Sequence, residues 1–284
     1  MKPQSTQLSL RISKGCYVVL KSKTPCIFSV VSALASAAIV LISVMTSANA
    51  ATISTQWTYE ISVVDGAPTP DATAKLIVGA ASLLGSVGVG SGQDTGTVDK
   101  NSYTLRSQVE GARLLTAVSS NLNVTRQSTG RFVNGVALTM RYSDKRGSTD
   151  ELVSVTNLAA KRYEFFKGNR PTGTEPFTVA ASDLVMAPYA FLGKPAPNKP
   201  SFLAVSDGRS IRQISLSPKS EPMKVAGKTV NAVRLSGQTA AGTFDLWIRA
   251  EDSYPLRMRV GLGAKYGAVL DQIAKDIPAG LISL

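Results

Sequence analysis

The sequence predicts an all-β domain, mainly antiparallel, in which a strongly curved sheet closes into a barrel or a two-sheet sandwich and carries one or two short helices. In residues 56–64, apolar side chains (Trp57, Tyr59, Ile61, Val63) alternate with polar ones, which is typical of a strand with one buried face. Roughly a dozen such β-prone runs follow, separated by turn residues. No strand–helix units alternate, which favours antiparallel pairing. So many strands hide their edges only by curling or stacking.

The strands that we expect share short length, β-prone composition and flanking turn residues. They lie at residues 56–64, 72–78, 102–109, 114–124, 131–142, 151–155, 162–167, 202–205, 210–216, 223–225, 229–235, 243–250 and 256–260.

Two segments predict helix. Residues 182–192 begin with Ser182, a good N-cap, and Asp183, whose charge suits the first turn; Pro188 limits this helix to one or two turns. Residues 268–277 carry apolar side chains at helical spacing and end before Pro278.

Two further segments predict loops. Residues 79–96 are dense in glycine but lack the lysine of a phosphate-binding loop, so we expect a flexible hairpin tip or an insertion. Residues 144–147 (Asp-Lys-Arg-Gly) read as a solvated turn.

The first 50 residues have the order of a secretory signal. A basic stretch without acids precedes the uncharged apolar run 27–45, and Ala48-Asn49-Ala50 follows it as a cleavage signature. We therefore expect a signal peptide at 1–50, cleaved after Ala50, and a single periplasmic domain at 51–284. The alternative is an uncleaved anchor, because the run is nearly long enough to span a bilayer. Either way the domain lies beyond the membrane.

Charge and composition exclude several classes of function. Of 31 basic residues, five lie in the leader, so 26 remain against 19 acids, a net charge of +7. These basic residues are scattered, which disfavours nucleic-acid binding. Cys16 and Cys26 both precede the apolar run, and the chain has no histidine. The mature domain therefore lacks disulfides, and catalysis by histidine or cysteine, ordinary zinc sites and cofactors are not expected.

Four short motifs resemble a family of bacterial exported proteins known as domain of unknown function 3108. They are residues 57–61 (Trp-Thr-Tyr-Glu-Ile), the helix predicted from Asp183 to Tyr189 before a proline-rich loop, residues 225–228 (Val-Ala-Gly-Lys), and residues 246–248 followed by 255–259 (Pro-Leu-Arg-Met-Arg). The resemblance covers nearly all of the mature chain. It implies export and β architecture and assigns no catalytic residues.

The best candidate ligand site combines an aromatic with basic side chains. Alternation places Trp247, Arg257 and Arg259 on one face of a hairpin, where a guanidinium group can stack on the indole. We add Tyr189 from the predicted helix. Such a face suits an amphipathic anion such as a lipid head group. The alternative is surface packing of long side chains on a tryptophan.

Three functions remain open, in this order. The first is a non-catalytic periplasmic carrier for an apolar or amphipathic ligand, possibly a lipid, since curved β architectures enclose such ligands. The second is an envelope structural or assembly factor that acts through protein contacts. The third is a histidine-independent hydrolase that uses paired carboxylates. Its candidate acids are Glu60, Glu110, Glu164, Asp245, Glu251 and Asp252.

Overall fold

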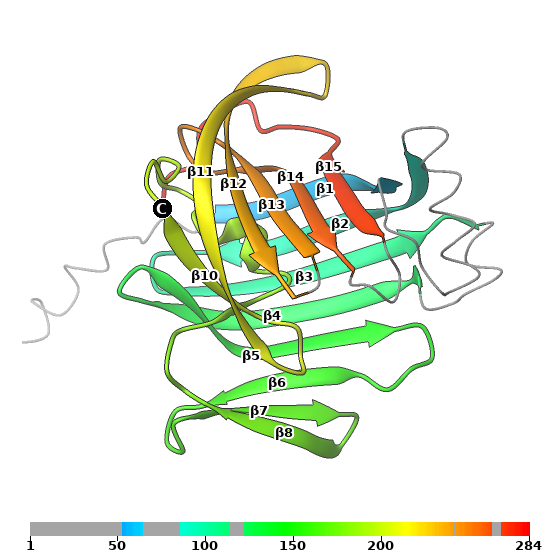
Figure 1. Cartoon of the computed structure of the whole chain (residues 1–284), viewed down its shortest axis with the longest axis vertical. Coiled ribbons are helices and arrows are strands. Elements are labelled where there is room, and N and C mark those ends of the chain that lie inside the picture. Colours follow the sequence, from blue (N-terminus) through cyan, green and yellow to red (C-terminus); the bar gives the residue numbers. More distant parts are fainter. Residues whose placement is uncertain (1–52, 65–85, 114–121, 241, 263–267) are drawn as a thin grey trace, which may run out of the picture. The chain divides into compact units, whose positions relative to one another are not determined.

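Fifteen strands of one sheet make up most of the described chain (Figure 1). The computed structural model describes residues 53–64, 86–113, 122–240, 242–262 and 268–284, which all belong to one compact unit, Asn49–Leu284. The predicted leader with Ala48 and Ala50, the predicted strand 72–78 and most of the predicted strand 114–124 lie outside the described residues.

The strands differ in length from two to fifteen residues, and one 3-10 helix is described among them. In chain order they are β1 (Ile53–Val64), β2 (Val87–Val98), β3 (Ser102–Gly111), β4 (Val124–Val133), β5 (Val136–Arg146), β6 (Leu152–Asn157), β7 (Arg162–Lys167), β8 (Arg170–Pro176), β9 (Ser182–Asp183), the 3-10 helix η2 (Ala187–Tyr189), β10 (Ser201–Ser206), β11 (Ile211–Val225), β12 (Lys228–Thr239), β13 (Gly242–Arg249), β14 (Pro255–Gly261) and β15 (Val269–Ala274).

Neighbours in the sheet are neighbours in the chain, except where β1 pairs with β15. Every described pairing is antiparallel apart from that of β9 with β10. The predicted all-β, mainly antiparallel class is therefore confirmed. The described sheet is strongly curved but does not close into a barrel, and its two edges are β8 and β9.

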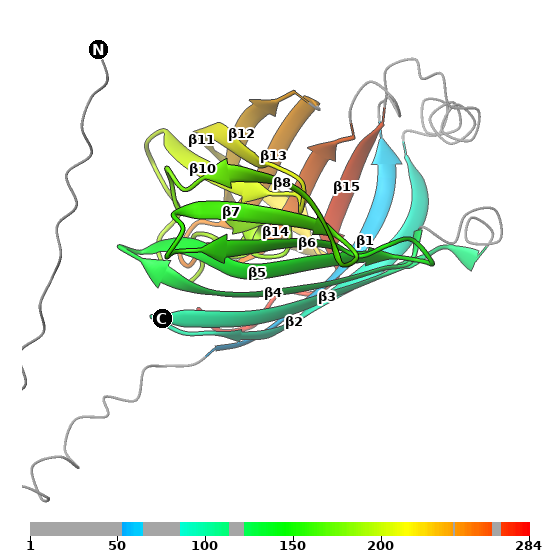
Figure 2. The same cartoon turned by 90° about the horizontal axis from the view of Figure 1, so that it is seen from below.

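Curvature brings the β9–β10 edge over the strands from the first half of the chain. The Thr139 amide in β5 donates to the Ala181 carbonyl at 2.8 Å, and the Ser206 hydroxyl donates to Ser154 in β6 at 3.1 Å. Figure 1 shows β10 and β11 crossing in front of β4 and β5, and Figure 2 shows the same strands from below. The sheet thus covers its own apolar face, which we call the concave face.

Residue register defines the two faces. Directly opposed residues of antiparallel strands point to the same side, and Trp247, Arg257, Ile273 and Glu60 are opposed in succession across β13, β14, β15 and β1. Trp57, three residues before Glu60, points to the other side. The concave face carries Trp57 and most of the core, and the convex face carries Trp247.

Two loop predictions are wrong. Residues 87–96 of the glycine-dense segment belong to β2, where glycine leaves room for large side chains of the neighbouring strands. Residues 144–146 belong to β5, and Asp144 is buried between arginines. We interpreted this short charged run as solvated because the sequence does not show which neighbouring groups bury Asp144.

The predicted strand 131–142 is two strands, β4 and β5, joined by a turn. Asn134 and Gly135 have φ values of 53° and 77°, as a two-residue hairpin turn requires. The Asn-Gly pair was the sequence signal for this hairpin, and the apolar residues on both sides obscured it.

The helix predicted at residues 268–277 is wrong, and the short helix predicted within residues 182–192 is found as a single 3-10 turn. Residues 269–274 form β15, since β1 and β14 both offer backbone partners to an extended segment. In residues 182–192 the only described helix is the single turn η2. Asp183, not Ser182, accepts the free amides there, from Val185 at 2.8 Å and Met186 at 3.0 Å.

Candidate functional site

Trp247, Arg257 and Arg259 come together on the convex face, as the alternation predicts. The guanidinium carbons of Arg257 and Arg259 lie 4.9 and 5.8 Å from the indole centroid. Arg234 in β12 joins them at 5.0 Å, a contact that the sequence interpretation missed because it paired only β13 with β14. We call these four residues the Trp247 cluster. Its indole is only 5% exposed.

Acidic partners neutralise the Trp247 cluster. The pairs are Arg234 with Asp245, Arg257 and Arg259 with Asp271, and Trp247 with Glu221. The indole Nε1 donates to Glu221 Oε1 at 2.7 Å, and Arg257 Nε donates to Asp271 Oδ1 at 2.7 Å. This arrangement favours packing of long side chains on a tryptophan over capture of an anion, because every positive group already has a carboxylate.

Tyr189 lies away from this cluster, on the concave face. Its hydroxyl donates to Asp94 Oδ2 at 3.2 Å, and its ring stands edge-on to Trp57 with centroids 6.3 Å apart. The predicted site residues therefore separate into two places on opposite sides of the sheet.

Around Tyr189 the structure assembles a buried polar centre, made of Trp57, Tyr59, Asp94, Ser107 and Tyr189. The Tyr59 hydroxyl donates to Asp94 Oδ1 at 3.2 Å and lies 3.3 Å from the Ser107 hydroxyl. Burial raises the pKa of Asp94 to about 6, although hydrogen bonds from Ser107, Tyr189 and Tyr59 work in the opposite direction. A carboxyl that titrates near neutral pH marks a candidate functional group.

Two more buried carboxylates flank the polar centre. Asp144 accepts from Arg126 Nε and Arg146 Nε, both at 2.9 Å. Burial acts to raise the pKa of Asp144, but these two arginines lower it to about 2. Asp183 accepts from Thr139 at 2.7 Å, and burial raises its pKa. Asp144 thus forms ion pairs with two arginines, whereas Asp94 and Asp183 accept hydrogen bonds mainly from uncharged donors.

The sequence held one signal for this centre. Alternation in residues 102–109 places Ser107 on the apolar side with Tyr103 and Leu105, and a hydroxyl on an apolar face implies a buried partner. That partner, Asp94, lies in the glycine-dense segment, which we interpreted as a loop.

One polar atom at this centre has no partner. The Trp57 Nε1 is buried and makes no hydrogen bond with any residue that the structure describes. Its ring packs against Tyr59 with centroids 4.5 Å apart. A buried indole donor normally finds an acceptor, so this atom is the best indicator of an unfilled interaction on the concave face.

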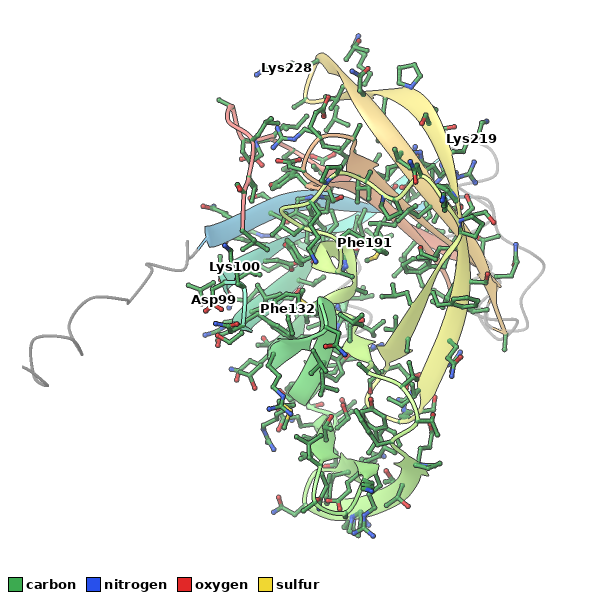
Figure 3. The ribbon with its side chains drawn as sticks, turned by 90° about the vertical axis from the view of Figure 1, so that its left-hand side faces the viewer. Asp99, Lys100, Phe132, Phe191, Lys219 and Lys228 are labelled. Carbon is green, nitrogen blue, oxygen red and sulfur yellow. The ribbon has the colours of Figure 1, made fainter. Side chains whose placement is uncertain are left out.

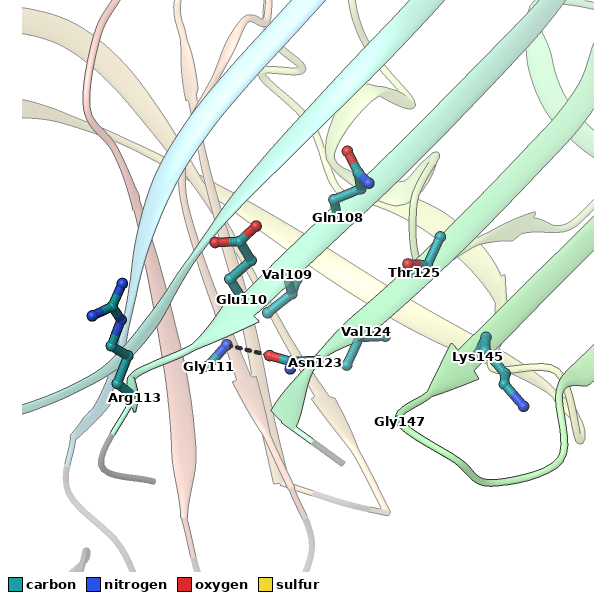
Figure 4. Close-up of a pocket in the computed structure, with 10 residues that line it drawn as sticks. All are labelled: Gln108, Val109, Glu110, Gly111, Arg113, Asn123, Val124, Thr125, Lys145 and Gly147. Atoms are coloured by element: carbon teal, nitrogen blue, oxygen red, sulfur yellow. Dashed lines mark hydrogen bonds between the residues drawn. The ribbon is translucent and has the colours of Figure 1, made fainter. Parts of the chain in front are cut away.

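Two clefts open on the surface of the described chain. The larger, about 490 Å³, lies at the ends of β3, β4 and β5 and includes Glu110, Arg113 and Lys145 (Figure 4). Within it the Gly111 amide donates to the Asn123 side chain at 3.0 Å. The smaller, about 340 Å³, lies beside β12 and the C-terminal segment. Neither cleft is lined by residues of the polar centre.

The acids proposed for hydrolysis are dispersed. Four have a basic partner: Glu60 with Lys275, Glu164 with Arg162, Asp245 with Arg234 and Asp252 with Arg249. Glu110 and Glu251 line the two separate clefts. Within the described ranges, no group of three or more acidic, histidine or cysteine side chains is placed to bind a metal ion.

Comparison with family models, curated proteins and solved structures found no match for this chain. The resemblance to domain of unknown function 3108 therefore stays a prediction. Among the residues placed in the structure, no helix is long and apolar enough to cross a bilayer.

Proposed function

We propose that this protein is a non-catalytic periplasmic carrier that binds an apolar or amphipathic ligand, possibly a lipid, on the concave face of its sheet. The observation that carries the proposal is the cover of that face. Residues 184–192, which we call the strap, lie over it with a single 3-10 turn as their described regular structure. In the described chain the rest of its cover comes from strands of the same curved sheet, and no long helix lies on it.

The strap is chemically similar to an apolar ligand. Its side chains are apolar except for Tyr189, and Val185, Met186 and Leu192 are buried in the main core. Figure 3 places Phe191 between the half of the sheet that carries Phe132 and the strands β11 and β12 that carry Lys219 and Lys228. Side chains thus fill the concavity, and a ligand would take the place of the strap.

The chemistry of the chain supports a binding role. There is no histidine, and the two cysteines lie in the leader. The residues after Ala50 therefore lack histidine, the side chain most often used as a general base, and the cysteine nucleophile.

The two tryptophans allow a direct test, since they lie on opposite faces of the sheet. A lipid with a brominated acyl chain quenches indole fluorescence on contact. We expect it to quench Trp57 in the Trp247→Phe variant. In the matched Trp57→Phe variant, we expect little quenching of Trp247, because arginines cover its indole. Native mass spectrometry of protein from its own envelope should show an added lipid mass. Quenching of Trp247 alone, with bare protein mass, would reject the concave carrier.

One observation favours the second candidate, an envelope assembly factor. Phe202 in β10 is 77% exposed, and the two-residue edge strand β9 pairs only with Val205 and Ser206 of β10. Such an edge suits addition of a strand from a protein partner. A photo-crosslinking residue at position 202 should then capture one reproducible envelope protein in cells. The control is the same photo-crosslinking residue in place of Thr104 on the convex face. Equal crosslinking from both positions would reject the assembly factor.

A further inference from the structure

The strap is hydrogen-bonded to the rest of the protein at both ends and is held between them mainly by apolar packing. At its start, Asp183 binds Thr139 and the first strap amides. After its end, the Gly193 amide donates to Asp252 O at 2.8 Å. Tyr189 has the only polar side chain in the strap, so its bond to Asp94 is the strap's single side-chain hydrogen bond. Apart from this contact, apolar packing holds the middle of the strap to the sheet.

Tyr189 contacts two side chains, Asp94 and Trp57, which differ in how well their hydrogen-bonding groups are satisfied. Asp94 accepts hydrogen bonds from Tyr59, Ser107 and Tyr189. Trp57, directly opposite Asp94 in the register, has a buried Nε1 without an acceptor among the described residues. When the strap lifts, Asp94 loses the Tyr189 hydroxyl and offers a free acceptor oxygen on the strand opposite Trp57, whose Nε1 is a donor without an acceptor among the described residues.

A ligand group that fills both sites must accept one hydrogen bond and donate another. A hydroxyl or a hydroxy-ester does both, whereas an ammonium group offers Trp57 no acceptor. A carboxylate would meet the Asp94 carboxylate in a buried place. The nearest cation, Arg126, is already paired with Asp144. The other titratable groups at the centre, Tyr59 and Tyr189, are held neutral because burial raises the pKa of each.

We propose that lifting of the strap opens a head-group subsite at Trp57 and Asp94 that selects uncharged, hydroxyl-bearing amphipaths such as monoacylglycerols. The proposal rests on the carrier function and names the ligand class of that same face. The Trp57 Nε1 donates to the head group, whose hydroxyl donates to the Asp94 oxygen that Tyr189 releases. The acyl chain replaces the apolar side chains of the strap.

Calorimetric titration of the mature protein with monooleoylglycerol and with oleate at pH 8 tests the selectivity. We expect monooleoylglycerol to bind at least about tenfold more tightly than oleate, because Asp94 is ionised at this pH. Asp94→Asn should narrow the difference by improving oleate binding. Equal affinity of the wild-type protein for both lipids would overturn the subsite and leave the carrier function standing.

Two variants separate the subsite from general lipid binding. Trp57→Phe keeps an aromatic ring and should weaken monooleoylglycerol binding about five- to tenfold, with little effect on oleate. Tyr189→Phe removes the strap's bond to Asp94 and should tighten binding and speed hydrogen exchange in the strap. Tyr254→Phe, which loses its bond to the Gln56 carbonyl, is the matched control and should change neither.

The outcomes are distinguishable. Unchanged monooleoylglycerol affinity in Trp57→Phe rejects the subsite while lipid binding persists. Binding of neither lipid, together with hydrogen exchange in the strap that Tyr189→Phe does not alter, rejects both the subsite and the carrier.

Discussion

Gly92 in β2 lies directly beneath the ring of Tyr59 in β1. A Cβ atom added at Gly92 would lie 2.3 Å from two ring carbons of Tyr59, closer than any van der Waals contact allows. The two residues are opposed in the register, so the glycine creates the space in which the tyrosine reaches Asp94. This pairing explains why a glycine-dense segment forms a strand here.

We predict that Gly92→Ala destabilises the protein by about 1–3 kcal/mol, because the Tyr59 ring must move and its hydroxyl leaves Asp94. Gly88→Ala in the same strand is the control, since nothing lies within 4 Å of its added Cβ. Urea unfolding followed by circular dichroism measures both. Equal stability of the two variants would contradict the role of Gly92.

Asp94 should make stability fall as pH rises from about 4 to about 6. Its pKa in the folded protein, about 6, lies above its ordinary value of 3.8. The folded state therefore binds the proton more tightly than the unfolded state, and the stability that this group contributes is greatest below pH 4. The loss across this window is about 3 kcal/mol, at about 1.4 kcal/mol per pKa unit. Asp94→Asn should remove this part of the dependence, and exposed Asp150→Asn should not. Denaturant midpoints between pH 3.5 and pH 7 measure it, and parallel profiles for all three proteins would contradict it.

Asp144 should make stability change with pH in the opposite direction. Its pKa of about 2 lies below the ordinary value, so its contribution is present above about pH 4 and is lost as pH falls toward 2. Removing Arg126, whose side chain is 17% exposed, leaves a buried carboxylate without its inner partner. We expect Arg126→Met to cost about 3 kcal/mol at pH 7.

Arg146→Met is the control for this pair, since Arg146 is 45% exposed and its loss should cost about 1 kcal/mol or less. Thermal unfolding at pH 7 ranks the two variants. A larger loss for Arg146→Met would show that Arg126 is not the main partner.

The C-terminal segment should depend on Arg249. Its guanidinium pairs with Asp252 and donates to the Pro278 and Gly280 carbonyls at 3.0 Å each, and Asp252 also accepts the Ile282 amide at 2.8 Å. We expect Arg249→Met to release residues 278–284, seen as faster hydrogen exchange and trimming by carboxypeptidase. Arg257→Met on the convex face should leave this segment protected. Unchanged exchange in Arg249→Met would contradict the prediction.

The leader should be removed on export. We predict that the protein recovered from the periplasm begins at Ala51, since Ala48 and Ala50 supply the small residues of the cleavage site. Intact mass and N-terminal sequencing check this. Ala50→Leu should block processing and leave the longer chain in the membrane fraction, whereas Ala51→Leu should be processed. A full-length wild-type chain in the membrane would support the anchor instead.

Local patterns predicted much of the fold. Alternation in residues 56–64, 102–109 and 162–167 located β1, β3 and β7, because a period of two records a buried face along one strand. The convex group of Trp247, Arg257 and Arg259 followed from the same rule applied to one hairpin. The errors came where local signals were ambiguous: Asn134-Gly135 within an apolar run, and residues 268–277, whose helical spacing gave way to pairing with β1 and β14.

The sequence by itself determined the β class, the side of the sheet on which each alternating residue lies, and the absence of histidine chemistry, since these depend only on residue type and near neighbours. Only the tertiary structure decided that Asp94, Tyr59 and Tyr189 meet. They come from β2, β1 and the strap, and Asp94 and Tyr189, which share a hydrogen bond, are 95 positions apart in the chain. Their contact depends on how the sheet curves over itself, which arises from the packing of all its strands and leaves no mark in any single segment.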